Sequence, residues 1–250
     1  MIEKSATPTP PQDEAQWLET NRKFYDSLWR DARLIQPQRF NTWPLVSSLV
    51  QASMTRLEIA PGLRPRLPIA GTHFVDISEP ALRALAKGEG HAFMGTITSL
   101  PVAAGSMDVV CALDIVEHVD DDVRAFAELS RITRAGGVLL LSTPLHQSKW
   151  LAFDDFVGHR RRYAPQELLD HLGRGGFVIE QSAVYGMQPR SSKLLDLGMW
   201  YLTHRRERAM WWYNRVFMPL ALRFSKKLPM VRGVLDMEKA DEVLLVCRRK

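Results

Sequence analysis

Cysteine and long apolar runs are scarce in this chain of 250 residues. It has only two cysteines, Cys111 and Cys247, which stand far apart in apolar stretches. We expect buried free thiols in a reducing compartment, and we predict neither disulfides nor a zinc site nor any other metal site. No window approaches about 18 uninterrupted apolar residues, and no signal peptide is visible. The expected location is cytoplasmic, with contact at the inner face of a membrane left open.

The charge balance is mildly basic, with 33 Lys and Arg against 28 Asp and Glu and a formal net charge of +5. Such an excess suits phosphate, anionic substrates or acidic lipid, although a solvated surface is its commoner origin. The basic residues stand in short scattered groups without a recognisable RNA-binding appendage, so nucleic acid is not expected as a partner.

Strand-like and helix-like segments alternate through the middle of the chain. Short apolar runs predict strands at residues 57–60, 73–77, 92–95, 107–113, 138–142, 177–184 and 242–247. Amphipathic segments predict helices at residues 14–34, 45–54, 79–87, 121–133 and 165–172. This alternation predicts an α/β fold: a doubly wound, Rossmann-like, mostly parallel seven-stranded sheet with helices on both faces.

The chain divides into five predicted segments. Residues 1–12 are polar and rich in proline, and we expect a disordered tail there. Residues 13–54 form an N-terminal helical cap, and residues 55–186 form the core. Residues 187–239, crowded with Trp, Tyr, Met and Arg, form a helical insertion before the last strand at residues 240–250.

Polar residues and a glycine follow the predicted strands where a doubly wound sheet binds its ligands. Glu58 and Gly62 lie at the end of the first strand, Asp76 ends the second, Thr96 follows the third, and Asp114 follows the fourth. A carboxylate at the end of the second strand can accept hydrogen bonds from both hydroxyls of a ribose. A single glycine in the first turn lets the backbone approach a ligand closely.

Five stretches in this order resemble the class I S-adenosylmethionine-dependent methyltransferases, in particular the small-molecule group called methyltransferase type 11. They are LEIAPG, FVDIS, TSLPVAAGSMDVVCALDIVEHVDD, ELSRITRAGGVLLLSTP and GHRRRYAPQELLDHLGRGGFVIE. The resemblance implies S-adenosylmethionine as the cofactor, with Asp76 on the ribose. The cofactor residues it implies are Glu58, Ala60, Gly62, Asp76, Ile77, Thr96, Ile97, Leu113, Asp114 and His118.

The first turn departs from the family pattern. The family usually has three glycines at alternate positions, but Ala60 and Arg64 stand at two of them here, and Thr96 stands where the family usually has an aspartate. Few residues separate Gly62 from Phe74, so the family's helix after the first strand is expected to be reduced to a loop. A nicotinamide dehydrogenase is disfavoured because its fingerprint needs those glycines and a helix N-terminus beneath a pyrophosphate.

The acceptor side must be predicted from the N-terminal helix, the loop 146–163 and the insertion. We expect His159 to be a general base, with a packing role at the start of the next helix as an equal alternative. The predicted substrate-binding residues are Tyr25, Trp150, Phe153, Phe156 and Tyr163. For the insertion, an acceptor lid ranks first, a homodimer interface second and an amphipathic anchor at an anionic membrane third.

These features predict a methyltransferase acting on a small, partly apolar metabolite, with an oxygen, carbon or nitrogen as acceptor atom. The acceptor is expected to be lipid-like or anionic. The alternative is a subunit that keeps the methyltransferase fold but has weak or no activity and serves as a binding scaffold.

Overall fold

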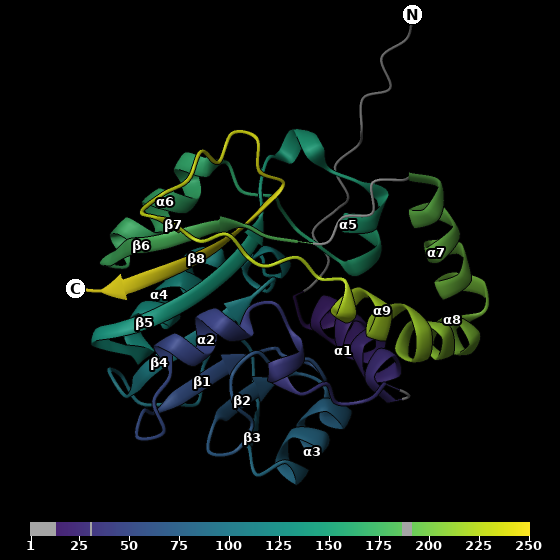
Figure 1. The fold of residues 1–250 in the computed structure, drawn as a ribbon, viewed down its shortest axis with the longest axis horizontal. Coiled ribbons are helices and arrows are strands. Elements are labelled where there is room, and N and C mark those ends of the chain that lie inside the picture. The colour runs from purple at the N-terminus through teal and green to yellow at the C-terminus, as the bar shows by residue number, and fades with distance from the viewer. Residues whose placement is uncertain (1–13, 31, 187–191) are drawn as a thin grey trace, which may run out of the picture.

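A single mixed sheet of eight strands forms the centre of the computed structural model, which describes residues 14–30, 32–186 and 192–250 (Figure 1). The strands are β1 Arg56–Ile59, β2 His73–Asp76, β3 His91–Met94, β4 Met107–Leu113, β5 Thr133–Pro144, β6 Phe177–Val184, β7 Val231–Arg232 and β8 Glu242–Arg249. Their order is β3-β2-β1-β4-β5-β8-β6-β7. Strands β1 to β5 run parallel, and β8 is antiparallel to both β5 and β6.

The α/β class and the mostly parallel sheet are as predicted, but the strand count is eight rather than seven. The additional strand is β7, a two-residue edge strand paired with β6. Two residues are too few to show an alternating pattern, so the sequence contains no signal for it. The predicted tail at residues 1–12 lies outside the described residues.

Helices cover both faces of the sheet. They are α1 Glu14–Arg30, α2 Trp43–Leu49, α3 Glu79–Lys87, α4 Asp122–Ile132, α5 Ala152–Val157, α6 Pro165–Arg174, α7 Ser192–His204, α8 Arg206–Trp212 and α9 Met218–Arg223, with a π-helical turn Tyr213–Phe217 between the last two. Helices α4 and α6 pack on one face and α2 on the other. Helices α1, α5 and α7–α9 gather on the right of Figure 1, opposite the tip of the antiparallel β8 and thus where the parallel strands end.

The central strands are buried on both faces. On one face Val110 and Leu139 are fully buried with α4 and α6, and on the other face Val109 and Leu140 are buried with α2. A strand covered on both sides reads as a nearly continuous apolar run, which is why the sequence located β1, β4 and β8 closely. β5 is longer than predicted, because it begins at Thr133 rather than at residue 138. Cys111 and Cys247 are buried free thiols, as predicted. Among the described residues, no helix is long and apolar enough to cross a membrane.

A loop, not a helix, connects β1 to β2, which confirms the prediction from the shortened sequence. Glu58, buried in β1, holds this loop because its carboxylate accepts hydrogen bonds from the backbone N–H groups of Arg66 (2.8 and 3.0 Å) and Leu67 (2.9 Å). The side chains of Leu63 and Leu67 are buried beneath the loop. Apolar side chains of the loop therefore fill part of the space beside the sheet.

Helix α1 is packed onto the first turn of this loop. Gly62 has a φ of +55°, and a Cβ atom built on it would lie 2.3 Å from Cζ2 of Trp29. Trp29 also packs with Leu63 and with Ala81 of α3. Glycine is therefore required at residue 62 by the backbone conformation and by the indole ring against it.

We expect Gly62→Ala to destabilise the protein more than Gly105→Ala. Gly105 also has a positive φ, +60°, but no atom lies within 4 Å of the position that its Cβ would take. The Gly105 change should cost about 1–2 kcal/mol for the left-handed backbone alone. The Gly62 change should cost about 1–3 kcal/mol more, because the methyl group overlaps Trp29. Urea denaturation of both variants measures this difference, and equal losses would contradict the packing of α1 on the turn.

Candidate active site

A cavity of about 630 Å³ opens at the carboxyl ends of β1, β2 and β4. It lies at the point where the strand order reverses between β1 and β4, the usual ligand position in a doubly wound sheet. Nine of the ten predicted cofactor residues line it: Glu58, Ala60, Asp76, Ile77, Thr96, Ile97, Leu113, Asp114 and His118. The structure thus brings together residues that lie between positions 58 and 118 of the chain.

Gly62, the tenth predicted residue, lies beneath the cavity rather than in its lining. Its backbone N–H donates a hydrogen bond to Oδ2 of Asp76 (2.9 Å), and its Cα faces Trp29. It therefore shapes the floor of the cavity through its backbone. Direct contact between Gly62 and the cofactor stays a prediction.

Asp76 is a buried carboxylate at the end of β2. Its Oδ1 accepts a hydrogen bond from the backbone N–H of Ser78 (2.8 Å), while Oδ2 accepts the bond from Gly62. Burial raises the pKa of Asp76 to about 6, and these backbone hydrogen bonds oppose the rise. Each carboxylate oxygen has a further lone pair, so Asp76 can still accept hydrogen bonds from a ligand.

Glu58 also lines the cavity, but its oxygens are occupied by the loop that follows. Burial raises the pKa of Glu58 to about 7, and the hydrogen bonds from Leu67 and Arg66 oppose the rise. Because it fixes the backbone of Arg66, whose side chain also lines the cavity, Glu58 acts on the site mainly as a positioning residue.

Two lining residues adopt left-handed backbone conformations although neither is glycine. Ala60 has a φ of +52° and Asp114 a φ of +50°. Ala60 stands where the resembled family has its first glycine, and the backbone has kept the glycine-like conformation. Asp114 is held there because its backbone N–H and Oδ1 both bond the hydroxyl of Ser142 (3.1 and 2.5 Å). Strain of this kind is concentrated at functional sites.

Helix α1 forms the opposite wall through Asn21, Tyr25 and Trp29. Tyr25 was predicted as a substrate residue and does line the cavity. Burial raises the pKa of Tyr25, so its hydroxyl remains protonated at neutral pH. Asn21 and Trp29 were not predicted, because helical spacing shows which residues share a face but not what that face covers.

Two arginines that the sequence did not assign to the site also line the cavity. The Arg64 guanidinium lies 5.1 Å from the ring centre of Trp29 and 4.7 Å from that of Tyr213, in the π-helical turn. The Arg66 guanidinium lies 3.6 Å from the ring centre of Phe40. In the sequence, Arg64 stands out only because it replaces a glycine of the family pattern. Its position between two aromatic rings depends on the fold.

The other predicted acceptor residues do not line this cavity. Tyr163 is fully buried, and its hydroxyl donates a hydrogen bond to Asp122 Oδ2 (3.0 Å) and lies 3.3 Å from the Val116 carbonyl oxygen. Trp150 bonds Asp155 at the surface, Phe156 packs edge-on to Phe24 at 5.7 Å, and Phe153 is exposed. These four positions correct the predicted acceptor pocket, because the loop packs against α1 and the core.

His159, the predicted general base, lies behind His118 rather than in the cavity lining. The two rings meet edge-on with 4.6 Å between their centres, and His159 Nδ1 lies 2.7 Å from Asp154 Oδ1. Burial lowers the pKa of both histidines, that of His118 to about 3, with the neighbouring His159 as a second cause. His118 is therefore neutral at pH 7. His159 is not among the residues that line the cavity, which fits the alternative of a packing role, and its role as a general base stays a prediction.

Comparison with known proteins agrees with this geometry. Residues 48–141 match the profile of a methyltransferase domain. A probable S-adenosylmethionine-dependent methyltransferase of Mycolicibacterium smegmatis is 32% identical over 90 residues, covering 35% of each chain. An uncharacterized methyltransferase of a Mycobacterium species is 27% identical over 177 residues, covering 68% of this chain and 64% of the relative. The chain thus spans between a third and two thirds of the length of these relatives.

Among solved structures, an S-adenosylmethionine-dependent methyltransferase of Thermotoga maritima, described as a possible histamine N-methyltransferase, aligns with a TM-score of 0.55. It covers 94% of both chains at 17% identity, a likeness that shows the fold alone. The cofactor of the matched family is S-adenosylmethionine. The domain match, the sheet order and the residues at the strand ends together show that the chain is similar to class I S-adenosylmethionine-dependent methyltransferases.

Proposed function

We propose that the protein transfers a methyl group from S-adenosylmethionine to a small, partly apolar acceptor. The observation that carries the proposal is the cavity at the switch point, where nine of the predicted cofactor residues meet. Its volume of about 630 Å³ falls within the range of small-molecule sites. Its lining combines carboxylates with the aliphatic side chains of Ile59, Ile77 and Ile97.

The donor set of the cavity fits this cofactor. The carboxylates of Asp76 and Asp114 suit a ligand that carries hydroxyl groups and positive charge. Asp76 would hold the ribose hydroxyls, Thr96 and Ile97 would contact the adenine, and Arg64 would pair with the carboxylate of the amino-acid end. When bound, S-adenosylmethionine supplies an electrophilic methyl group on a sulfonium.

The protein's own contribution to the reaction is to orient the acceptor and exclude water. Tyr25 and Trp29 of α1 close the cavity on the side opposite the strands. Holding two reactants in line can provide effective molarities of about 10⁵–10⁸ M, so transfer does not require a general base. This agrees with the position of His159 outside the cavity lining.

Asp76→Ala should weaken binding of S-adenosylmethionine and S-adenosylhomocysteine by roughly 10- to 150-fold for each hydrogen bond lost to the carboxylate. Isothermal titration measures both ligands. Asp170→Asn, a change of an exposed carboxylate on α6, is the control and should leave affinity unchanged. If the wild-type protein binds neither ligand below millimolar concentration, the proposed function fails, and a scaffold without methyl transfer is favoured.

The affinity for S-adenosylhomocysteine should fall by roughly tenfold between pH 7.5 and pH 5, because only ionised Asp76 accepts hydroxyl hydrogen bonds well. The raised pKa of about 6 places this loss inside the accessible range. Glu58, with a pKa of about 7, titrates in the same range, so the comparison is made with Asp76→Asn. A profile that stays equally steep in that variant would assign the pH dependence to another group.

The insertion carries an exposed aromatic face. Helices α7 and α8 lie at the outer edge of the molecule, beyond α1 and α5 in Figure 1. Trp200, Trp211 and Trp212 are each about half exposed, and Phe224 is 74% exposed. None of these four lines the cavity, so the predicted role of the insertion as a lid stays a prediction.

Basic side chains accompany this aromatic face. The exposed basic residues between residues 196 and 227 are Arg205, Arg208, Arg215, Arg223, Lys226 and Lys227. The acidic residues in the same segment are Asp196 and Glu207. Aromatic and basic side chains on one helical surface are typical of elements that bind anionic membranes, where each cation contributes about 1 kcal/mol. We therefore propose that this surface binds anionic lipid, which also suits a lipid-like acceptor.

The protein should co-sediment with phosphatidylglycerol vesicles and not with phosphatidylcholine vesicles, and high salt should release it. Trp211→Ser with Trp212→Ser should reduce binding at least tenfold, because two half-exposed indoles are removed. Phe93→Ser with Met94→Ser, which changes exposed residues on β3, is the control. Unchanged binding in the tryptophan variant, or a stable homodimer through these tryptophans in sedimentation, would contradict the proposal.

A further inference from the structure

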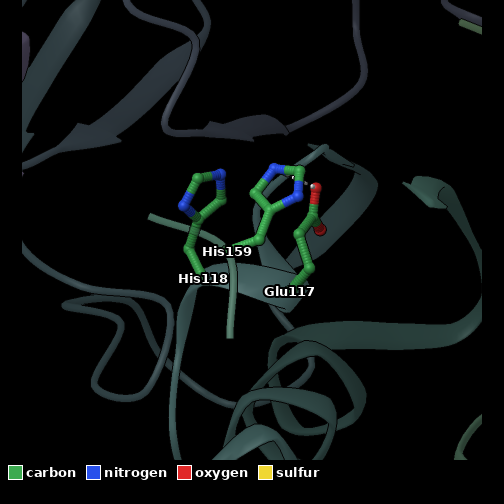
Figure 2. A group of neighbouring side chains, drawn as sticks. All are labelled: Glu117, His118 and His159. Carbon is green, nitrogen blue, oxygen red and sulfur yellow. Dashed lines mark ion pairs between the residues drawn. The ribbon is translucent and has the colours of Figure 1, made fainter. Parts of the chain in front are cut away.

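One glutamate and two histidines meet behind the cavity wall. Glu117 and His118 lie in the helical turn Val116–His118 after β4, whereas His159 follows α5. In Figure 2, His159 stands between the other two side chains. One ligand atom from each residue lies within 4.8 Å of the other two. Small movements would bring all three to one metal ion, because metal–nitrogen and metal–oxygen bonds are about 2.0–2.2 Å long.

Two of these side chains have an atom that lacks a hydrogen-bond partner among the described residues. Glu117 is fully buried and His118 is 6% exposed, yet Glu117 Oε1 and His118 Nδ1 accept or donate no hydrogen bond there. His159 Nε2 lies 3.9 Å from Glu117 Oε1, which is too far for a hydrogen bond. Buried polar atoms are rarely left unpaired. Glu117 Oε1, which faces His159 Nε2, therefore indicates a missing ligand.

Neighbouring residues hold two side chains of this cluster, those of His159 and Glu117, in place through hydrogen bonds. Asp154 Oδ1 lies 2.7 Å from His159 Nδ1, which directs the other ring nitrogen toward Glu117. Arg162 fixes Asp154 through two hydrogen bonds of 3.0 and 2.9 Å. The Thr143 hydroxyl donates to Glu117 Oε2 (3.2 Å) and so leaves Oε1 available to a ligand. A metal-binding imidazole usually donates the N–H of its other ring nitrogen to a carboxylate, as His159 can do to Asp154. Arg162 does not occupy the cluster, because it is paired with Asp154 in the bidentate manner described above.

We propose that Glu117, His118 and His159 bind one divalent transition-metal ion at the wall of the cavity. Two imidazole nitrogens and one carboxylate oxygen suit Zn²⁺, Mn²⁺, Fe²⁺ or Co²⁺, whereas Mg²⁺ and Ca²⁺ prefer oxygen ligands alone. Three protein ligands leave at least one coordination position open. Because His118 itself lines the cavity, the ion would lie between the buried cluster and the space for ligands.

A second group of similar composition provides a matched control. Asp122, Glu167 and His171 also place ligand atoms within 4.8 Å of one another. There, however, Asp122 Oδ2 is already bonded to the Tyr163 hydroxyl and to Arg161 (2.7 Å), and Glu167 is exposed. This group is therefore satisfied without an ion.

The test is metal binding by the full chain after removal of bound metal with a chelator, in the absence of S-adenosylmethionine. Zn²⁺ is titrated calorimetrically, and Co²⁺ is followed by its visible absorption bands. We expect one ion per chain at this site, with an affinity reduced at least tenfold in Glu117→Gln, His118→Ala and His159→Ala. His171→Ala should leave the affinity unchanged.

His73 and His91 lie close together on neighbouring strands, with 5.1 Å between their ring centres, and could bind a second ion weakly. The titration is therefore repeated in His91→Ala, in which ions bound between His73 and His91 no longer add to the number of Zn²⁺ ions bound per chain. If a cluster variant folds poorly, the wild type still gives an answer, because Zn²⁺ should raise its melting temperature in proportion to binding. Absence of Zn²⁺ binding, or equal loss in His171→Ala, would overturn the proposal. Neither outcome bears on methyl transfer.

Discussion

Two buried carboxylates hold the floor of the site together. Glu58 accepts hydrogen bonds from the backbone N–H groups of Arg66 and Leu67. Asp76 accepts hydrogen bonds from those of Gly62 and Ser78. In the resembled family a helix begins here, and its first N–H groups would form the floor. In this chain the loop has no helix, so its N–H groups need other acceptors, since unpaired buried donors are costly. Burial raises the pKa of both acids, because it disfavours their charged forms.

The same loop explains why α1 belongs to the site. Without a helix after β1, a space remains beside the first turn, and the indole of Trp29 fills it against Gly62. Arg64 then lies between Trp29 and Tyr213, so the loop, α1 and the insertion meet around one guanidinium. The short connection in the sequence thus determines which element closes the cavity.

The parts that sequence predicts well are those fixed by local pattern. β4, β6 and α3 match their predicted ranges, because the residues that each element buries recur at the spacing of a strand or a helix. The strand-end residues Asp76, Thr96 and Asp114 follow from chain order alone, since parallel strands all end at one edge. Short elements such as α5 and β7 leave too few residues for a pattern.

The acceptor side could not be predicted because it depends on which side chains meet across the fold. Tyr163 and Phe153 belong to the same aromatic loop, yet one is fully buried against Asp122 and the other is exposed. His159 has the composition of a base near a cavity, but the ring of His118 stands next to it. Composition identifies the residue types of a site, whereas the packing of α1 and of the loop decides which of them face it.

The loss of the helix at the first turn restricts what the cavity can bind. A helix N-terminus attracts phosphate because its free N–H groups and dipole favour negative charge. Here the N–H groups of the loop donate hydrogen bonds to Glu58 and Asp76. Carboxylates therefore lie where a phosphate would lie at a helix N-terminus. A dinucleotide would lose its pyrophosphate site, whereas S-adenosylmethionine has no phosphate and carries a positive sulfonium. The remodelled floor therefore disfavours dinucleotides and leaves a cavity suited to the cofactor of this family.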